Sequence, residues 1–367
     1  MWKNNLVILV LLTCIQNSYG QDFPADLSGV KIPKPEEIMF EEHIDFSKVK
    51  SMVTLINRNT NVQDFDTLYI KHYNQDGWLE KEINFSNNQR WNITTNTYSD
   101  GKLVKGTWHN LTKNSRTELN YNYNTDDQLT NFNRKEISLK DNKVLDEHNM
   151  IVHYENGKPI ETTKKIAYSS LSGNYKTKYR YSDSLLIETK SINGKTKINN
   201  SSRFEYDELG RVVQRSSYIE SEYYKVPHLQ ARSSYTYNSR GLLILDSLVL
   251  YDSKMTKVTR FKYDQNERLV WMKEHIQKKG KDNYLESHFK YENEKLIAIN
   301  SVRVKNLDYV TWRIPICRKL EKKSIGKPKN ANIIYTYDEK SSRIGTEYTL
   351  EDDSGCSQWK HIIEYRN

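Results

Sequence analysis

The sequence predicts an all-β protein, a long antiparallel meander of roughly twenty strands built from hairpin repeats of 25 to 31 residues. Two observations predict this fold. Short segments in which two aromatic residues flank a polar one recur along the chain, and a turn sequence rich in Asp, Asn and Gly follows them. A third is composition: 26 of the 367 residues are Tyr, whereas Gly and Pro number only 14 and 7. Tyrosine suits half-buried strands, because its ring packs while its hydroxyl needs a hydrogen-bond partner.

Each aromatic–polar–aromatic segment predicts part of a strand with one buried face. Successive side chains of a strand point to opposite faces, so both aromatic residues share one face and the polar residue takes the other. The copies are Tyr121–Tyr123, Tyr179–Tyr181, Phe204–Tyr206, Tyr235–Tyr237, Phe261–Tyr263, Phe289–Tyr291 and Tyr335–Tyr337.

The segment after each aromatic pair predicts a tight turn. An Asp or Asn side chain accepts hydrogen bonds from backbone amides two residues on, and a glycine in the left-handed conformation closes the hairpin. The expected structural turn positions are Gly77, Gly101, Gly157, Asp207, Gly210, Gly241, Asp264 and Asp338. Weaker hairpins are expected where another residue replaces the glycine, at Asp127, Ser184, Glu267 and Glu294.

The predicted number of strands limits how such a sheet lies. Twenty strands spaced about 4.8 Å apart make a sheet roughly 100 Å wide. Open twisted sheets rarely exceed about ten strands without curling or splitting. We therefore expect the meander to curl into a coil, a trough or a shell, with its aromatic face inward.

One turn resembles a known repeat family closely. The segment Tyr206–Val212 reads YDELGRV and resembles the Y-D-x-x-G-R-L hallmark of YD-repeat proteins, also called RHS repeats. Tyr263–Leu269 matches it except at Glu267, and short copies such as Tyr154–Lys158 are similar to MORN-type repeats, the runner-up family. The resemblance covers about residues 65 to 367 and implies a β-hairpin repeat fold. In long RHS proteins the repeats form a spiralling β-shell around a toxin, but this chain is far shorter and lacks their glycine- and asparagine-rich self-cleavage motif.

The N-terminal region predicts export. Residues 1–20 combine Lys3, an apolar run from Leu6 to Ile15 and small residues before Gln21, as a signal peptide does. The alternative is a lipoprotein anchored at Cys14. Residues 21–60 are expected to form an extended leader and cap, and residues 61–367 the repeat array. No later segment is apolar enough to cross a membrane as a helix, so we expect a periplasmic, cell-surface or secreted protein.

The sequence carries no motif that predicts catalysis, a metal or a cofactor. The nine His residues are scattered, and zinc-binding, nucleophile-elbow and phosphate-loop patterns are missing. The neighbours Glu147 and His148, like Glu274 and His275, are expected on the surface because a strand sends them to opposite faces. We therefore expect no enzyme, although paired glycosidase carboxylates leave no local motif and keep that alternative open.

An insertion at about residues 301–330 is the predicted binding region, because the spacing from Tyr291 to Tyr337 is 46 residues. Aromatic and basic side chains together suit an acidic glycan, since rings stack on sugars and Arg pairs with carboxylate or sulfate. The alternative is a degenerate repeat with a solvated basic loop. The candidate binding residues are Tyr309, Trp312, Arg313, Arg318, Lys322 and Lys323. Cys317 and Cys356 are candidates for a disulfide in an exported chain.

These observations favour a non-catalytic, exported repeat protein of the cell envelope that binds a surface glycan or protein. Its net charge of +9 is consistent with an acidic glycan or an envelope protein as partner, with no nucleic acid expected. The alternative is that interspersed lysines only keep a large sheet soluble. Two alternatives stay open: a structural scaffold that meets its neighbours through an exposed terminal strand at Ile362–Tyr365, and a small shell or immunity-like component of a toxin system. The oligomeric state is open.

Overall fold

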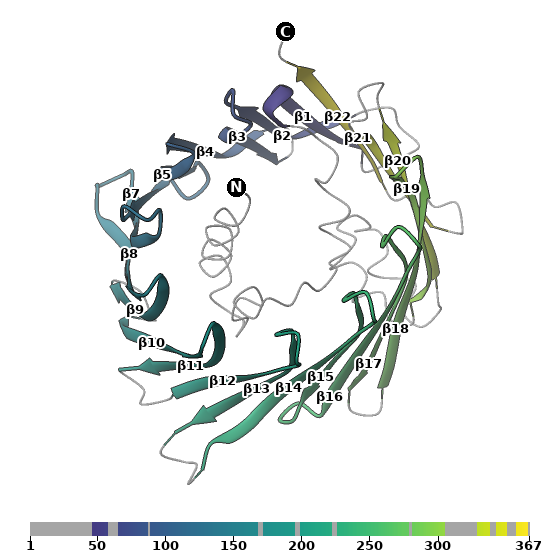
Figure 1. Ribbon diagram of the computed structural model, residues 1–367. Coiled ribbons are helices and arrows are strands. Elements are labelled where there is room, and N and C mark those ends of the chain that lie inside the picture. Colours follow the sequence, from purple (N-terminus) through teal and green to yellow (C-terminus); the bar gives the residue numbers. More distant parts are fainter. Residues whose placement is uncertain are drawn as a thin grey trace. The chain divides into compact units, whose positions relative to one another are not determined.

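The computed structural model describes residues 46–57, 65–86, 89–167, 172–194, 199–221, 226–278, 281–304, 329–337, 343–350 and 357–365. Within these ranges the chain forms one short 3-10 helix (Phe46–Lys48) and 22 strands, and the predicted all-β antiparallel meander is confirmed (Figure 1). No helix in the described ranges is both long and apolar enough to span a membrane. That the whole meander curls on itself stays a prediction.

The strands follow one another along the chain with short connections. They are β1 (Val49–Asn57), β2 (Asp66–Tyr73), β3 (Leu79–Ser86), β4 (Gln89–Ser99), β5 (Lys102–Asn110), β6 (Ser115–Tyr123), β7 (Leu129–Ser138), β8 (Val144–Glu155), β9 (Lys158–Ala167), β10 (Gly173–Ser182), β11 (Leu185–Asn193), β12 (Asn199–Tyr206), β13 (Val212–Glu220), β14 (His228–Tyr237), β15 (Leu243–Leu250), β16 (Met255–Tyr263), β17 (Leu269–Lys278), β18 (Lys281–Glu292), β19 (Lys295–Val304), β20 (Lys329–Tyr337), β21 (Arg343–Leu350) and β22 (Ser357–Tyr365).

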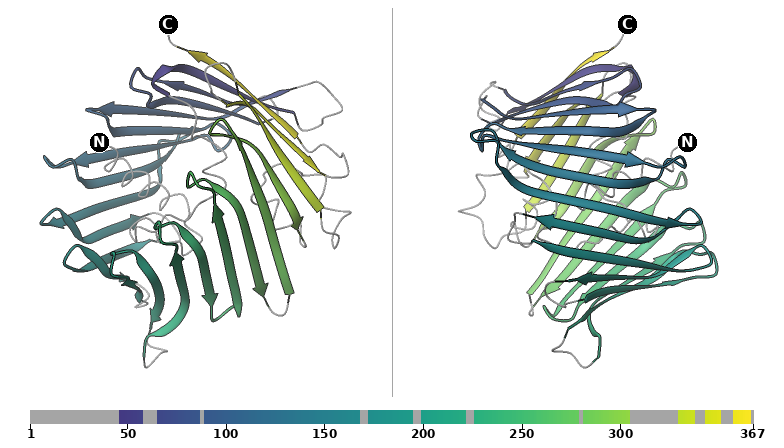
Figure 2. Two further views of the ribbon diagram at one scale, coloured as in Figure 1. Left: turned by 45° about the vertical axis from the view of Figure 1, so that its right-hand side comes forward. Right: turned by 90° about the vertical axis from the view of Figure 1, so that its left-hand side faces the viewer.

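The chain divides into two compact units. Among the described residues, the first unit contains Tyr98–Thr107 and Asn114–Lys254, and the second contains the parts before Tyr98, Trp108–Lys113 and everything from Met255 on. In the first unit, β6 to β15 pair in sequence order, each antiparallel to the next. Figure 2 shows these strands from two further sides.

The second unit contains a long-range pairing. Its strands β16 to β22 pair in order, and β1 then lies between β22 and β2. Ile363 lies opposite Met52, and Glu364 accepts hydrogen bonds from Lys50 Nζ at 2.7 Å and Ser51 Oγ at 2.8 Å. The prediction of an exposed terminal strand at Ile362–Tyr365 is therefore wrong. The sequence did not reveal its partner because β1 lacks the aromatic pair of the repeats.

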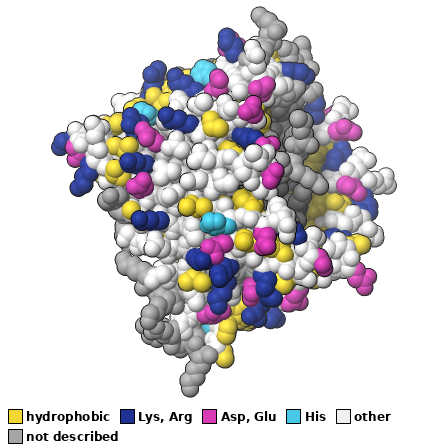
Figure 3. All heavy atoms as spheres, turned by 60° about the vertical axis from the view of Figure 1, so that its left-hand side comes forward, with side chains coloured by type: hydrophobic (Ala, Val, Ile, Leu, Met, Phe, Trp, Pro, Cys, Tyr) yellow, Lys and Arg dark blue, Asp and Glu magenta, His cyan; other side chains and the backbone are white. Residues whose placement is uncertain are grey.

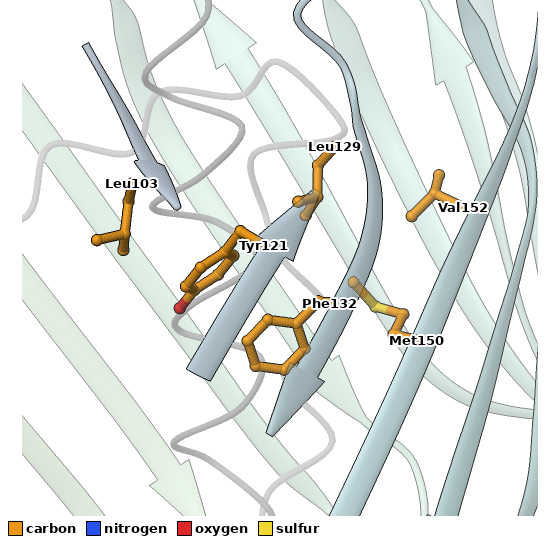
Figure 4. Packing of buried hydrophobic residues seen from close by; sticks show 6 residues of the cluster. All are labelled: Leu103, Tyr121, Leu129, Phe132, Met150 and Val152. Carbon is orange, nitrogen blue, oxygen red and sulfur yellow. The ribbon is translucent and has the colours of Figure 1, made fainter. Parts of the chain in front are cut away.

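In each unit the sheet has two different faces, here called the aromatic face and the polar face. Along β6, Ser115, Thr117 and Tyr121 are buried on the aromatic face, whereas Asn120 and Asn122 are exposed on the polar face. Figure 4 shows a cluster of buried hydrophobic residues on the aromatic face in the first unit, where the rings of Tyr121 and Phe132 lie 5.0 Å apart. This alternation is the one that the aromatic–polar–aromatic segments predict.

The repeat turns use their acidic and glycine residues as structural parts. Asp207 Oδ1 accepts hydrogen bonds from the amides of Leu209 and Arg211, at 3.0 and 2.9 Å. Gly210 closes the same turn at a φ of 71°, a conformation that glycine adopts without steric cost. Asp264 caps its turn in the same way. The glycines at 77, 101, 157 and 241 also have positive φ, and so do Asp127, Glu267 and Glu294, which stand in the glycine position; Asp338 lies outside the described residues.

In the first unit, the second aromatic residue of five repeats ties its hairpin to the preceding one. The tyrosine hydroxyl donates a hydrogen bond to the carbonyl of the first or second residue of the preceding return strand. These bonds join Tyr123 to Leu103, Tyr154 to Leu129, Tyr181 to Pro159, Tyr206 to Leu186 and Tyr237 to Val212, at 2.6 to 3.1 Å. The basic residue after the turn glycine covers the ring of the next repeat, as Arg211 does over Tyr237 at 4.7 Å. The Y and R positions of the motif therefore couple neighbouring hairpins.

Two tyrosines of the first unit are expected to respond oppositely when the hydroxyl is removed. Tyr237→Phe loses the bond to Val212 and is expected to lower the free energy of unfolding by about 1 kcal/mol. The hydroxyl of Tyr121 is buried with no hydrogen-bond partner in the described structure, so Tyr121→Phe is expected to raise that free energy by about 1 kcal/mol. Urea unfolding of both variants measures the difference, and a loss of stability in both would contradict the assignment.

The tyrosine face also predicts loss of stability in alkali. Burial raises the pKa of Tyr123, Tyr181, Tyr237 and Tyr263 to about 12, whereas an unfolded tyrosine titrates near 10. Between these values the unfolded chain has released its phenolic protons and the folded chain has not. Because stability falls with pH wherever the folded state binds more protons, the urea midpoint is expected to fall steadily from about pH 10 to about pH 12. An unchanged midpoint across that window would contradict the burial of these phenols.

Candidate functional site

The residues predicted to bind a ligand lie outside the described part of the chain. They are Tyr309, Trp312, Arg313, Arg318, Lys322 and Lys323, and the two cysteines, Cys317 and Cys356, also lie outside it. The strands on either side of the insertion are described. β19 and β20 are antiparallel neighbours, and Val304 pairs with Lys329. The extra chain therefore connects two adjacent strands of the meander, like the shorter hairpin connections.

The described residues contain a different group of basic and aromatic side chains, on the polar face of β16, β17 and β18 in the second unit. Lys262 lies opposite Trp271, which lies opposite His288. In the next row Arg260 lies opposite Lys273, which lies opposite Glu286. The basic patch is defined here as Arg260, Lys262, Trp271, Lys273, Tyr284, Glu286, His288 and Lys290.

The basic patch carries more positive than negative charge. Arg260, Lys262 and Lys290 are exposed, and among the described residues none of the three has a carboxylate within ion-pair distance. Like charges directly opposite each other, as at Arg260 and Lys273, destabilise a sheet pair. The basic patch thus concentrates cations although their repulsion lowers the stability of the sheet.

Some cations on the polar face elsewhere are paired with carboxylates. In the first unit Arg180 and Arg203 both contact Glu188, at 3.1 and 3.2 Å, and Lys190 contacts Glu220 at 2.7 Å. Figure 3 shows one face of the molecule on which basic and acidic side chains are interspersed among neutral ones. In the basic patch, three exposed cations without such a partner among the described residues lie around one indole.

Two side chains hold the indole of Trp271 in a fixed position. Its Nε1–H donates a hydrogen bond to Glu286 Oε1 at 2.8 Å, and Lys262 Nζ lies 4.7 Å from the ring centroid. The indole hydrogen bond and the neighbouring Lys273, 3.2 Å from the carboxylate, lower the pKa of Glu286, which therefore stays ionised at neutral pH. Lys273 also lies over the ring of Tyr284 at 5.9 Å. An anion that attracts Lys262 would uncover the indole face for stacking.

The aromatic face contains a second polar group, which sequence reasoning missed. In the first unit, His148 Nε2 lies 2.9 Å from Asp146 Oδ2, and Arg134 contacts both Asp146 and Glu136. The side chain of His148 is 13% exposed, and burial lowers its pKa. Glu274, on the aromatic face of the second unit, is 1% exposed. The expectation that His148 and Glu274 lie on the surface is therefore wrong. Glu147 and His148 do point to opposite faces, as do Glu274 and His275, but His148 and Glu274 are the members that lie on the aromatic face.

The side chains of the basic patch are suited to electrostatic contact with anions. The described residues include no group of three or more His, Cys, Asp and Glu side chains placed to hold a metal ion. Exposed cations meet carboxylate, sulfate or phosphate groups, and the two aromatic rings offer apolar surface beside them. A sequence signal for part of the patch existed: Lys262 is the polar residue of the pair Phe261–Tyr263, and the hairpin register brings it opposite Trp271.

Comparisons with known proteins assign this chain to no family. No family model matches the chain, and no curated protein does. Among solved structures, the crystal structure of TcdB2-TccC3-Cdc42 aligns with 83% of this chain at 11% identity and a TM-score of 0.34; the chain spans only 19% of that protein's length. Porin-like proteins from Bacteroides uniformis and Bacteroides vulgatus align with 74% and 68% of the chain, at 10% and 8% identity and TM-scores of 0.27 and 0.22, over 95% and 94% of their own lengths.

Proposed function

We propose that this chain is a non-catalytic, exported β-hairpin repeat protein of the cell envelope, related to the YD-repeat proteins, that binds an acidic surface glycan. The single observation that carries the proposal is the basic patch, where exposed cations without carboxylate partners surround a fixed indole on one sheet face. Acidic polysaccharides present carboxylate or sulfate beside sugar rings, and both features of the patch match them.

The insertion adds to the same proposal. Val302 lies opposite Glu286 of the basic patch, and β19 ends two residues later at Val304, where the connection to β20 begins. The connection that contains the residues predicted to bind acidic groups therefore begins after Val304, close to the basic patch. We infer that the patch and Trp312, Arg313 and Arg318 serve one ligand.

A non-catalytic role is supported by how the repeat uses its polar side chains. The carboxylates of Asp207 and Asp264 accept hydrogen bonds from backbone amides in their turns. They also form ion pairs with Arg211 and Arg268, at 2.6 and 2.7 Å. Five tyrosine hydroxyls of the first unit, among them those of Tyr206 and Tyr237, donate hydrogen bonds to backbone carbonyls. These groups hold the fold together and are not free for acid–base chemistry.

Loss of two patch cations is expected to weaken binding to a sulfated polysaccharide. The chain starting at Gln21 is expected to be retained on immobilised heparin, and Arg260→Ala/Lys262→Ala is expected to weaken binding roughly tenfold, because each exposed charge contributes up to about 1 kcal/mol. Lys176→Ala/Lys190→Ala removes two cations that are paired with Glu161 and Glu220 and serves as the charge-matched control.

The outcomes separate site binding from general attraction. Equal losses in both double variants would show that only net charge matters, and the patch would not be the site. A wild-type chain that fails to bind heparin and polygalacturonate and captures no glycan from solubilised envelope would favour a purely structural repeat protein.

A further inference from the structure

Five asparagines form a compact grid on the polar face of β6, β7 and β8 in the first unit. Asn120 lies opposite Asn133, which lies opposite Asn149. In the adjacent row Asn122 lies opposite Asn131, which lies opposite Ile151. Neighbours are about 4.8 Å apart across strands and about 6.8 Å apart along them. The asparagine grid is defined as these five asparagines together with Ile151.

The side-chain amides of the asparagine grid do not contribute hydrogen bonds to the described part of the fold. None of the five side chains makes a hydrogen bond within the described structure, and Asn131 Oδ1 and Asn149 Oδ1 are shielded from solvent without a partner. Asparagine is disfavoured in strands, and a buried amide group without a partner costs roughly 1 to 3 kcal/mol. Other strand asparagines do bond, as Asn84 does to Asn92 at 2.7 Å. The grid therefore has binding capacity that the fold leaves unsatisfied.

The chemistry of the grid selects its ligand. Each amide supplies two N–H donors and a carbonyl acceptor and carries no charge. Ile151, 40% exposed, supplies the one apolar contact. Protein interfaces need a more apolar or aromatic centre, and an acidic polymer needs cations that these six positions lack. Paired hydroxyl groups, which both donate and accept, match a flat array of amides.

We propose that the asparagine grid is a binding site for a neutral, hydroxyl-rich glycan, separate from the basic patch. An extended sugar chain lies flat on the three strands, its hydroxyls pair with the amides, and one C–H face rests on Ile151. The proposal rests on the grid alone and holds whether or not the basic patch binds an acidic glycan.

The test uses the chain from Gln21 and three neutral polysaccharides, laminarin, mannan and dextran, in affinity electrophoresis at about 1 M salt, where charge interactions are screened beyond about 3 Å. Asn133 is the central residue, so Asn133→Ala is expected to weaken binding at least tenfold. Asn133→Val, which favours strand formation, is expected to do the same and guards against a folding defect. Asn199→Ala is the matched control, because Asn199 has an unpartnered amide oxygen but no asparagine opposite it on either neighbouring strand.

Retention by at least one polysaccharide, lost in both Asn133 variants and kept in Asn199→Ala and in Arg260→Ala/Lys262→Ala, is the expected result. The proposal is overturned if none of the three polysaccharides retards the chain. It is also overturned if the Asn133 variants bind like the wild type, or if they change the oligomeric state in size-exclusion chromatography, which would make the grid a contact between copies.

Discussion

Replacing Gly77 with alanine is expected to lower the free energy of unfolding by about 3 kcal/mol, from two independent causes. Gly77 has a φ of 81°, a region that costs an L-residue roughly 1 to 2 kcal/mol. An added Cβ would also lie 2.7 Å from the amide nitrogen of Ser47 and 2.8 Å from the carbonyl carbon of Phe46. Both atoms belong to backbone, so relief requires the 3-10 helix to move away.

That movement would break a local cluster. Phe46 stacks on Tyr73 with ring centroids 4.7 Å apart, and Tyr73 packs with Val49 and Met52 of β1. Gly101→Ala is the control, because Gly101 has a φ of 72° and no atom within 4 Å of the added Cβ. The control is expected to lose only about 1 kcal/mol in chemical denaturation. Equal losses in the two variants would mean that the helix does not pack on the β2–β3 turn.

Replacing Lys257 with methionine is expected to cost about 3 kcal/mol. Lys257 Nζ lies 2.8 Å from Glu274 Oε2 on the aromatic face, where the Glu274 side chain is only 2% exposed. Methionine keeps the length of the side chain and removes the charge, which leaves the buried carboxylate without this cation. Breaking a buried ion pair from one side costs roughly 3 to 5 kcal/mol.

The double variant Lys257→Met/Glu274→Leu tests the cause of that loss. With both charges gone, an apolar pair of similar volume occupies the same space, and most of the lost stability is expected to return. The double-mutant cycle, measured by urea unfolding at neutral pH, gives the coupling between the two side chains. A double variant less stable than Lys257→Met would show that Glu274 stabilises the sheet through contacts other than Lys257.

Local sequence was enough to predict the repeat. The pair Phe204–Tyr206 and the turn from Asp207 to Gly210 specify a half-buried strand and a hairpin through alternation and turn chemistry, which act within a few residues. The same local reasoning placed several left-handed residues, including Glu267 and Glu294, which have φ values of 64° and 66°. It did not place those at Asn114 and Lys254, and the structure has positive φ at Asp183 instead of the expected Ser184. It also required a partner for each tyrosine hydroxyl, which Tyr121 lacks among the described residues, and it did not indicate that the partner lies in the preceding hairpin.

The two candidate binding surfaces could not be predicted, because they depend on the register in which the strands pair, and local sequence patterns do not give that register. The pairing of β1 with β22 joins segments about 310 residues apart, and no short pattern marks it. The basic patch and the asparagine grid each combine side chains from three strands, so a shift of one residue in one strand would move its side chains to the other face. The predicted binding residues such as Trp312 and Arg313 lie outside the described residues, and their role stays a proposal.

The most direct test of the account is a titration of a sulfated oligosaccharide, such as a heparin fragment, against the chain from Gln21 and two variants of the basic patch. Lys262→Ala removes a cation and is expected to weaken binding severalfold. Glu286→Gln keeps a hydrogen-bond acceptor for Trp271 and removes the one carboxylate of the patch, so it is expected to tighten binding severalfold. Opposite shifts in Kd would place the acidic ligand at the basic patch. Unchanged Kd values, or weakening in both variants, would contradict the proposed function.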